Sequence, residues 1–350
     1  MLVPLLAAAA FSLGGGAPAP LPLDQAVGQR VIASLPGTTL PDALAADIRA
    51  GHVAGVILFS RNIASRAQLR ALTARMQAER RHGPRALRDL PLLVMIDQEG
   101  GLVKRLPGAP DHSPAELGRI GSAALARSDG AAAGRNLRGV GVNVDLAPVL
   151  DVGMPGSSVR ALGRTYGATP RMVIRLGLGF ADGLAAAGVL ACVKHFPGLG
   201  RGVAIEDDVL NRIDAPLDAL RRVDEAPFRA AARHGVPLAM VSTGVYPALS
   251  GRPAMFAPTI ATGELRERVG FGGVAITDDL EVAALARLSP ARKALAAVRA
   301  GDDLLLFAQT AAAADAGRAA LVRAVRAGTL PRATIDAGAA RVLALRERLR

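Results

Sequence analysis

Cysteine is almost absent from this chain of 350 residues, in which Cys192 is the only one. A single thiol excludes disulfides within the chain and zinc sites built from several thiolates. Cys192 lies inside the apolar run VLACV, which is typical of a packed core thiol rather than of a ligand or a nucleophile. Its chemistry therefore gives no direct lead to function.

Aromatic residues and lysine are also scarce. The chain has no Trp and 2 Tyr, and its lysines are Lys104, Lys194 and Lys293. The formal net charge of +12 therefore comes almost entirely from arginines scattered along the chain, with no basic tract. A nucleic-acid surface needs clustered basic residues with aromatics among them. We interpret the charge as a compositional bias toward Arg and expect no nucleic-acid partner.

Long apolar runs are missing after the first 23 residues. Spanning a bilayer takes roughly 20 consecutive apolar residues, so we expect no stable membrane insertion. The start, MLVPLLAAAAFSLGGGAPAPLPL, has an apolar stretch followed by small residues and prolines, with no basic residue before it and no lipobox cysteine. We expect residues 1–22 to be a signal peptide or a disordered segment, and the protein to be exported, extracellular or associated with the cell wall. A cytoplasmic location is the alternative.

The rest of the chain alternates short β-rich apolar runs with segments of helical period, such as 65–81, 171–188 and 216–235. The apolar runs are RVIASL (30–35), VAGVILFS (53–60), PLLVMIDQ (91–98), NVDLAPV (143–149), VLACVKHF (189–196), LAMVSTG (238–244), GVAITDD (273–279) and DDLLLFAQ (302–309). Such alternation predicts parallel strands joined by crossover helices, and eight strands is the barrel number. With no linker or internal repeat, we expect one (β/α)8 TIM barrel over residues 23–350. A doubly wound open sheet is the alternative, but its Gly-rich phosphate-binding motif is missing.

Polar residues gather where these apolar runs end. In a barrel, the carboxyl ends of all strands converge on one mouth, where active sites are built. The residues at these ends are Arg61, Asn62, Asp97, Gln98, Glu99, Asp151, Lys194, His195, Ser242, Thr243, Asp278 and Asp279. The mouth is therefore the expected site.

Five segments, in order along the chain, resemble family 3 glycoside hydrolases, especially the single-barrel bacterial β-N-acetylglucosaminidases. They are IDQEGGLVKRL (96–106), NVDLAPVLDV (143–152), GRTYGATP (163–170), KHFPG (194–198) and ITDDLEV (276–282). The resemblance extends from about residue 23 to the carboxyl terminus. It implies a hydrolase of β-linked N-acetylhexosamine, from cell-wall or chitin-type fragments, that retains anomeric configuration by double displacement.

Transferred position by position, the resemblance implies that Asp278 attacks the anomeric carbon. It also implies that the hydroxyls and the 2-acetamido group of the sugar are held by Asp97, Arg105, Arg164, Lys194 and His195. The carbohydrate substrate is the only partner expected, with no metal or organic cofactor. The sequence carries no signal for an oligomeric state.

The residue types suggest simpler alternatives for some of these positions. Asp97 and Arg105 would form an ion pair across the mouth without binding a sugar, and His195 would be a core histidine bonded to a neighbouring strand. Lys194 fits a binding role better, because a Lys in an Arg-rich chain indicates the need for a compact point charge. The resemblance assigns no role to Glu99.

Asp278 and Asp279 are adjacent. Neighbouring side chains of an extended strand point to opposite sides, so we expect only one of the two to face the mouth. The resemblance selects Asp278. Asp279 is then expected to cap the following helix.

The chain departs from the family in the loop that supplies the acid/base. The family's loop reads Lys-His-Phe-Pro-Gly-His-Gly-x-x-x-x-Asp-Ser-His, with its last His as the acid/base. Here the loop reads KHFPGLGRGVAIEDDVLNR (194–212) and has no His after His195. Ungapped counting places Asp207 at the acid/base position, and a one-residue slip places Glu206 or Asp208 there.

Three interpretations of this loop follow. Asp207, or otherwise Glu206 or Asp208, replaces the His as the general acid, which requires that burial or the nearby Asp278 raise its pKa. A different loop supplies the acid. The barrel binds a sugar with little turnover. A glycosidase that transfers the sugar to phosphate is a further alternative, and an acidic solvated turn is the simplest reading of residues 206–208.

Overall fold

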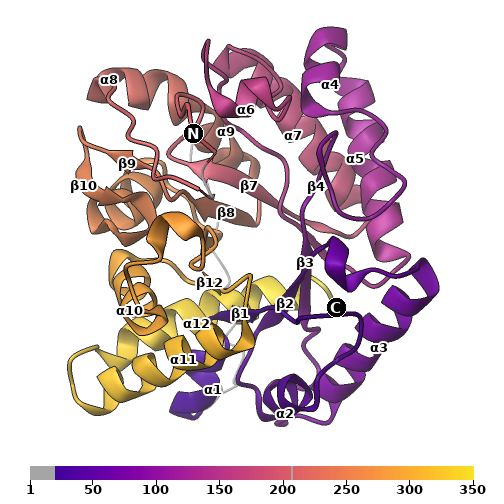
Figure 1. The fold of residues 1–350 in the computed structure, drawn as a ribbon, viewed down its shortest axis with the longest axis vertical. Helices are drawn as coiled ribbons and strands as arrows, with labels where there is room; N and C mark the ends of the chain where they lie inside the picture. Colours follow the sequence, from indigo (N-terminus) through magenta and orange to yellow (C-terminus); the bar gives the residue numbers. More distant parts are fainter. Residues whose placement is uncertain (1–19, 206–207) are drawn as a thin grey trace, which may run out of the picture.

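The structure, a computed structural model, describes residues 20–205 and 208–350. Eight parallel strands pair in the order β11, β8, β7, β6, β3, β2, β1, β12, so that each strand lies beside its neighbours in the sequence. A parallel bridge between Ile276 and Leu304 brings β11 to β12 and nearly closes the ring. The predicted (β/α)8 barrel is confirmed. Figure 1 shows the helices arranged around it.

Each predicted apolar run contains one barrel strand. The strands are β1 (Val31–Ala33), β2 (Gly55–Leu58), β3 (Leu93–Ile96), β6 (Val144–Asp145), β7 (Leu190–Phe196), β8 (Leu238–Val241), β11 (Val274–Thr277) and β12 (Leu305–Leu306). Side chains alternate between the barrel interior and the helix layer. In β2, for example, Ile57 joins the interior cluster, whereas Val56 and Leu58 pack against the helices. Both faces are apolar because both are buried.

The helices pack outside the strands, and short 3-10 and π-helices occur between the α-helices. The α-helices are α1 (Leu23–Gly28), α2 (Asp42–Ala50), α3 (Arg66–Arg81), α4 (Pro114–Ile120), α5 (Ala123–Arg138), α6 (Ser158–Ala161), α7 (Pro170–Ala186), α8 (Leu217–Ala219), α9 (Ala226–His234), α10 (Pro290–Ala300), α11 (Ala311–Arg326) and α12 (Arg332–Glu347). Three 3-10 helices, η1 (Ser60–Asn62), η3 (Ala254–Phe256) and η5 (Ala283–Leu285), and two π-helices, η2 (Leu220–Asp224) and η4 (Thr259–Arg268), complete the helical elements of the described chain.

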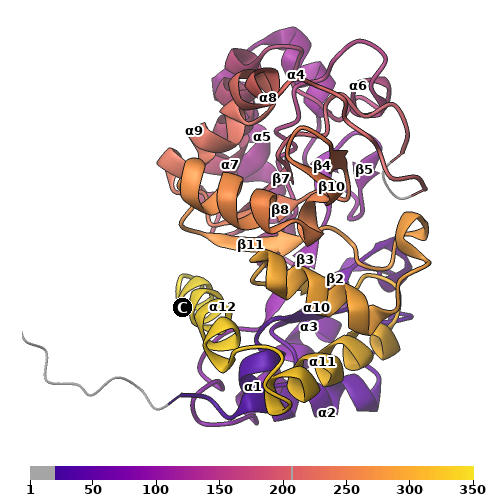
Figure 2. The same ribbon diagram turned by 90° about the vertical axis from the view of Figure 1, so that its left-hand side faces the viewer.

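The amino-terminal end of the barrel is closed by α12. Its Val342 and Leu345 join the interior cluster, and the buried Arg346 donates to the carbonyls of Leu90 and Pro91, which precede β3. The first and last helices, α1 and α12, are in contact, and Figure 2 shows them at the same end of the molecule. With this end covered, the opposite end is the one available for a site.

Two small hairpins at the carboxyl end were not predicted. One, β4 (Gln98–Gly100) with β5 (Val103–Lys104), follows β3, and the other, β9 (Val245–Tyr246) with β10 (Ser250–Pro253), follows β8. The helix predicted over 216–235 is also divided, into α8, η2 and α9. Pro227 near the start of α9 explains the break, because proline lacks the amide hydrogen and clashes with the preceding turn.

Within residues 20–205 and 208–350, none of the helices has the length and apolar character needed to cross a bilayer. The predicted leader, residues 1–22, lies almost entirely outside the described residues.

Candidate active site

A pocket of about 240 Å³ opens at the carboxyl end of the barrel. It is bordered by six of the seven residues predicted for the site: Asp97, Arg105, Arg164, Lys194, His195 and Asp278. They come from strand ends and loops that are far apart in the sequence, so only the closed ring of strands brings them together. The seventh, Asp207, lies outside the described residues, as does Glu206.

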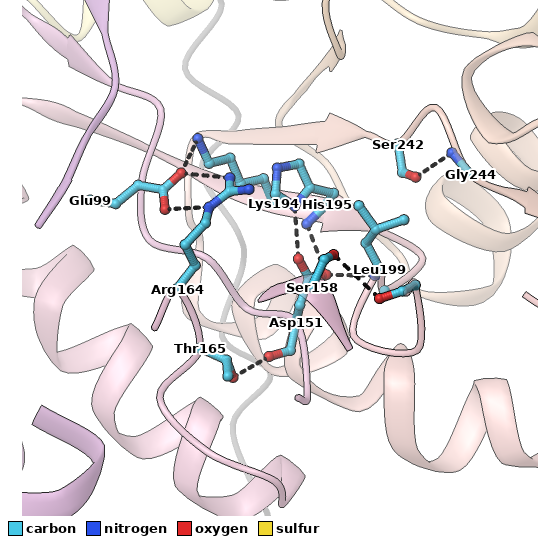
Figure 3. A network of polar contacts seen from close by, with 12 residues as sticks. Glu99, Asp151, Ser158, Arg164, Thr165, Lys194, His195, Leu199, Ser242 and Gly244 are labelled. Atoms are coloured by element: carbon cyan, nitrogen blue, oxygen red, sulfur yellow. Dashed lines mark hydrogen bonds and ion pairs between the residues drawn. The ribbon is translucent and has the colours of Figure 1, made fainter. Parts of the chain in front are cut away.

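The most buried part of the pocket is a network of ion pairs (Figure 3). Lys194 Nζ lies 2.7 Å from a carboxylate oxygen of Glu99. It also lies 2.7 Å from a carboxylate oxygen of Asp97. Arg164 binds both oxygens of Glu99, at 3.0 and 2.9 Å. The Glu99 side chain has no exposed surface. Lys194 and Arg164 are thus held against one carboxylate in a fixed geometry.

The network keeps Glu99 and Lys194 in their charged forms. Burial raises the pKa of Glu99, but Arg164 and Lys194 outweigh burial and hold that pKa well below its usual value. Burial likewise lowers the pKa of Lys194, yet the carboxylates of Asp97 and Glu99 hold it above the usual value. Arg105 is farther out, with a guanidinium nitrogen 3.8 Å from Asp97. The ion pair expected between Asp97 and Arg105 is therefore present at long range, within the pocket.

His195 is fixed by Asp151, which follows β6. The imidazole Nδ1 lies 2.7 Å from one oxygen of Asp151, and the other oxygen accepts the backbone N–H of His195 and of Leu199 (Figure 3). Burial lowers the pKa of His195, but Asp151 outweighs burial and raises the pKa overall. His195 therefore combines the two roles expected from the sequence. It bonds to Asp151, which follows the neighbouring strand β6, and it also borders the pocket.

Asp278 follows β11 directly, and its backbone N–H donates to the carbonyl of Val241 at the end of β8. One of its carboxylate oxygens accepts the backbone N–H of Asp279 at 2.9 Å, which limits rotation of the carboxylate. The side chain is 8% exposed. Asp278 is therefore a fixed carboxylate at the end of a rigid strand.

The two expectations for Asp279 were wrong. Asp279 also borders the pocket, because β11 ends at Thr277 and the alternation of an extended strand no longer applies. It caps no helix. Its carboxylate accepts the backbone N–H groups of Glu281 and Ala308 and the side-chain amide of Gln309. Burial raises the pKa of Asp279 to about 6.

Three carboxylates in or next to the site were not assigned a role from the sequence: Glu99 in the pocket, Asp151 behind His195, and Asp145 behind Gln98. Asp145, at the end of β6, is fully buried and accepts the backbone N–H of Gln98 through one oxygen. Burial raises the pKa of Asp145 to about 8. In the sequence, Glu99 could have been noticed as a second carboxylate two residues after Asp97. Asp145 could have been noticed as a carboxylate inside the largely apolar run 143–149.

The base of the loop 199–212 is tied to its surroundings. Backbone N–H groups of Met154 and Ser158 donate to carbonyls of Gly200 and Gly202, each at 2.8 Å. Arg201 donates through Nε to both oxygens of Asp224, at 3.0 and 2.9 Å. Farther along, Ile205 borders the pocket. Asp208 is exposed and is not among the residues bordering the pocket.

Residues 23–345 match the sequence model of the glycosyl hydrolase family 3 N terminal domain. The chain belongs to glycosyl hydrolase family 3. Its relatives include a protein of Arthroderma benhamiae named uncharacterized secreted glycosyl hydrolase, 37% identical over 332 residues and 92% of each chain. A beta-hexosaminidase of Alkalilimnicola ehrlichii is 36% identical over 271 residues, 73% of this chain and 74% of the relative.

Solved structures agree with this assignment. A β-N-acetylglucosaminidase from Paenibacillus sp. superposes with a TM-score of 0.88 at 36% identity, covering 94% of this chain and 63% of that one. A β-N-acetylhexosaminidase from Beutenbergia cavernae gives a TM-score of 0.84 at 31% identity, covering 93% and 99%. The family 3 barrel therefore extends over nearly the whole chain.

Among the described residues of this family 3 barrel, no group of three or more His, Cys, Asp or Glu side chains is arranged to bind a metal ion. The chemistry that these residues can supply is acid–base, nucleophilic and electrostatic.

Proposed function

We propose that this family 3 chain hydrolyses β-linked N-acetylhexosamine by a retaining double displacement. The observation that carries the proposal is the position of Asp278, a fixed carboxylate in the same small pocket as Lys194, Arg164 and His195. At about 240 Å³ the pocket is below the roughly 300 Å³ of the smallest usual ligand sites. It therefore suits one sugar unit at the end of a substrate. The names of the relatives, a beta-hexosaminidase and a β-N-acetylhexosaminidase, support an N-acetylhexosamine as that unit.

In the proposed mechanism, a carboxylate oxygen of Asp278 forms a bond to the anomeric carbon as the bond to the leaving oxygen breaks. A general acid gives its proton to that oxygen. Water then attacks the same carbon and releases Asp278, while its proton returns to the general acid. Asp97, Arg105, Arg164, Lys194 and His195 hold the hydroxyls and the 2-acetamido group, because charged groups on rigid strand ends bind such donors and acceptors well.

For the general acid we propose Asp207, with Glu206 and Asp208 as the alternatives. Support comes from the part of the loop that is described. Its base is anchored at Asp151 and Asp224, and Ile205, two residues before Asp207, borders the pocket. A carboxylic acid serves there only if its pKa is raised by burial or by the charge of Asp278.

We also propose that the protein is exported, as supported by the word secreted in the name of the Arthroderma benhamiae relative. Residues 1–22 would then be the leader and 23–350 the single catalytic barrel.

The test compares wild type and Asp278→Asn on two substrates: an activated aryl 2-acetamido-β-glucoside, whose leaving group needs little protonation, and a chitooligosaccharide, which needs much. We expect both activities to fall at least about 10³-fold, as when other nucleophiles are removed. Asp218→Asn, an exposed aspartate 67% exposed and not bordering the pocket, is the control. Sugar binding by wild type without turnover would instead indicate a binding protein, and turnover that depends on added phosphate would indicate a phosphorylase.

A further inference from the structure

The exposed aliphatic side chains of the described chain are concentrated at the pocket entrance. The large apolar side chains with high exposure are Leu102, Ile120, Val203, Ile205 and Val209, at 75%, 50%, 77%, 46% and 55%. All but Ile120 lie on two loops at the carboxyl end of the barrel, the turn of the β4–β5 hairpin and the loop after β7. Figure 2 shows both loops on the same side of the molecule.

Two of these residues, Leu102 and Ile205, border the pocket itself, together with the half-buried Val103 and Leu162. We call these four residues, with Val203 and Val209 beside Ile205, the aliphatic rim. The pocket thus has buried charged groups in its interior, Lys194 at 2% exposure for example, and exposed apolar groups at its entrance, Leu102 at 75% and Ile205 at 46%. Exposed apolar clusters of this kind mark binding surfaces.

We propose that the aliphatic rim binds an apolar aglycone, an alkyl or aryl group linked to the sugar in the pocket. The proposal rests on the proposed function, because the leaving group of a sugar attacked by Asp278 must lie toward the pocket entrance. The substrate class is then an amphiphilic glycoside whose polar and apolar halves match the two parts of the site. Apolar surface removed from water at the rim supplies the affinity.

The chemistry of the rim disfavours a second sugar as its occupant. Aliphatic side chains strip water from hydroxyl groups without replacing the lost hydrogen bonds, which is unfavourable. A sugar ring would otherwise stack on an aromatic face, but Phe59 is the one Phe, Tyr or Trp among the described residues that border the pocket. The guanidinium groups of Arg61 and Arg105 lie over its ring, 4.5 and 5.8 Å from the centroid.

The test is calorimetric titration with methyl, butyl and hexyl 1-thio-2-acetamido-β-glucosides. A sulfur at the scissile position keeps them intact, so binding is measured without turnover. A fully buried methylene strengthens binding about fourfold. Because the rim is open to solvent on one side, we expect the Kd to fall by about ten- to a hundredfold from methyl to hexyl, which is less than full burial would give.

The paired variant is Leu102→Asn with Ile205→Asn, and its matched control is Ile120→Asn, an exposed aliphatic residue on α4 away from the pocket. We expect the methyl-to-hexyl ratio of Kd values to fall below about threefold in the double variant and to stay at the wild-type value in the control. A wild-type ratio near one, or a ratio that survives in the double variant, would overturn the proposal. So would thio-linked chitobiose binding more tightly than the hexyl glycoside.

Hydrolysis of the matching oxygen-linked methyl glycoside separates the two proposals. If the methyl glycoside is not hydrolysed but the Kd still depends on chain length, the proposed hydrolase activity is refuted and the binding role of the aliphatic rim is retained. If it is hydrolysed and the Kd does not depend on chain length, the hydrolase activity is retained and the binding role of the rim is refuted.

Discussion

The floor of the pocket and its entrance differ in charge, in burial and in how firmly their residues are held by neighbouring groups. At the floor, Glu99 and Lys194 are buried and Arg164 is half-buried, and each is fixed by at least one ion pair of 2.7–3.0 Å. At the entrance, the described part of the loop 199–212 is tied at both ends, through Arg201 and Asn211, and between them it exposes the aliphatic side chains of Val203, Ile205 and Val209. The floor holds segments that resemble the motifs of family 3, whereas the loop has no His after His195. In the proposed mechanism, binding of the sugar and protonation of the leaving group would therefore be served by regions built in different ways, and each could be altered separately.

The largest effect on the choice between substrates is expected from Asp207→Ala, in the loop that follows β7. Loss of the general acid should lower kcat/KM for chitobiose about 10³-fold, within the usual range for proton transfer. A 2,4-dinitrophenyl glycoside should lose less than about tenfold, because its leaving group departs without a proton. Initial rates on both substrates give the ratio. If Glu206→Ala or Asp208→Ala shows the larger selective loss, that residue is the acid, and equal small losses in all three would place the acid outside this loop.

Glu99→Gln should lower kcat/KM about 10²-fold, mainly through KM. Glu99 acts as a positioning residue, since removing one partner of a buried ion pair costs about 3–5 kcal/mol and leaves Arg164 and Lys194 misplaced. The matched control is Glu264→Gln, a carboxylate of 6% exposure paired with Arg221 and Arg268 and not bordering the pocket. Both variants should lose thermal stability, but only Glu99→Gln should raise KM. Similar kinetic losses in the two variants would show that stability alone is responsible.

A further effect, on stability rather than on activity, concerns the pH dependence beneath the floor. The pKa of Asp145 is about 8 in the fold and about 3.9 when unfolded, so between these values the folded protein holds a proton that the unfolded chain releases. Protonated Asp145 therefore adds to the free energy of unfolding, and this contribution is fully present below about pH 4. It is lost as the pH rises toward 8, by up to about 1.4 kcal/mol per pH unit.

Asp145→Asn removes this titration. Urea unfolding at pH 5, 6 and 7 should therefore show the wild-type free energy of unfolding falling relative to that of Asp145→Asn. Asp218→Asn, at an exposed position, should show no such trend. Parallel pH profiles for wild type and Asp145→Asn would mean that Asp145 is ionised in the fold.

The barrel could be predicted because strands buried on both faces appear as short apolar runs, and each of the eight runs contains a strand. The hairpins could not, because β5 and β9 have two residues each, too few for a periodic signal. Pro227 was a visible signal for the divided helix, but the helical period around it outweighed that signal.

The candidate site was predictable where a residue falls at the end of an apolar run and inside a segment that resembles a family 3 motif, as for Lys194, His195 and Asp278. Glu99 was missed because its ion-pair partners, Arg164 and Lys194, lie far along the chain and are brought close only by the fold. Asp279 was misjudged because the rule of alternating sides was applied one residue beyond the end of β11.

Cys192 lies inside the barrel with no exposed surface, and burial raises the pKa of its thiol, so thiol reagents have neither access nor a thiolate to attack. The natural chain therefore has no cysteine that a thiol reagent would label. A cysteine introduced at Val209 would be the single reactive position, and a fluorophore or spin label placed there would report directly on how the loop responds when a sugar fills the pocket.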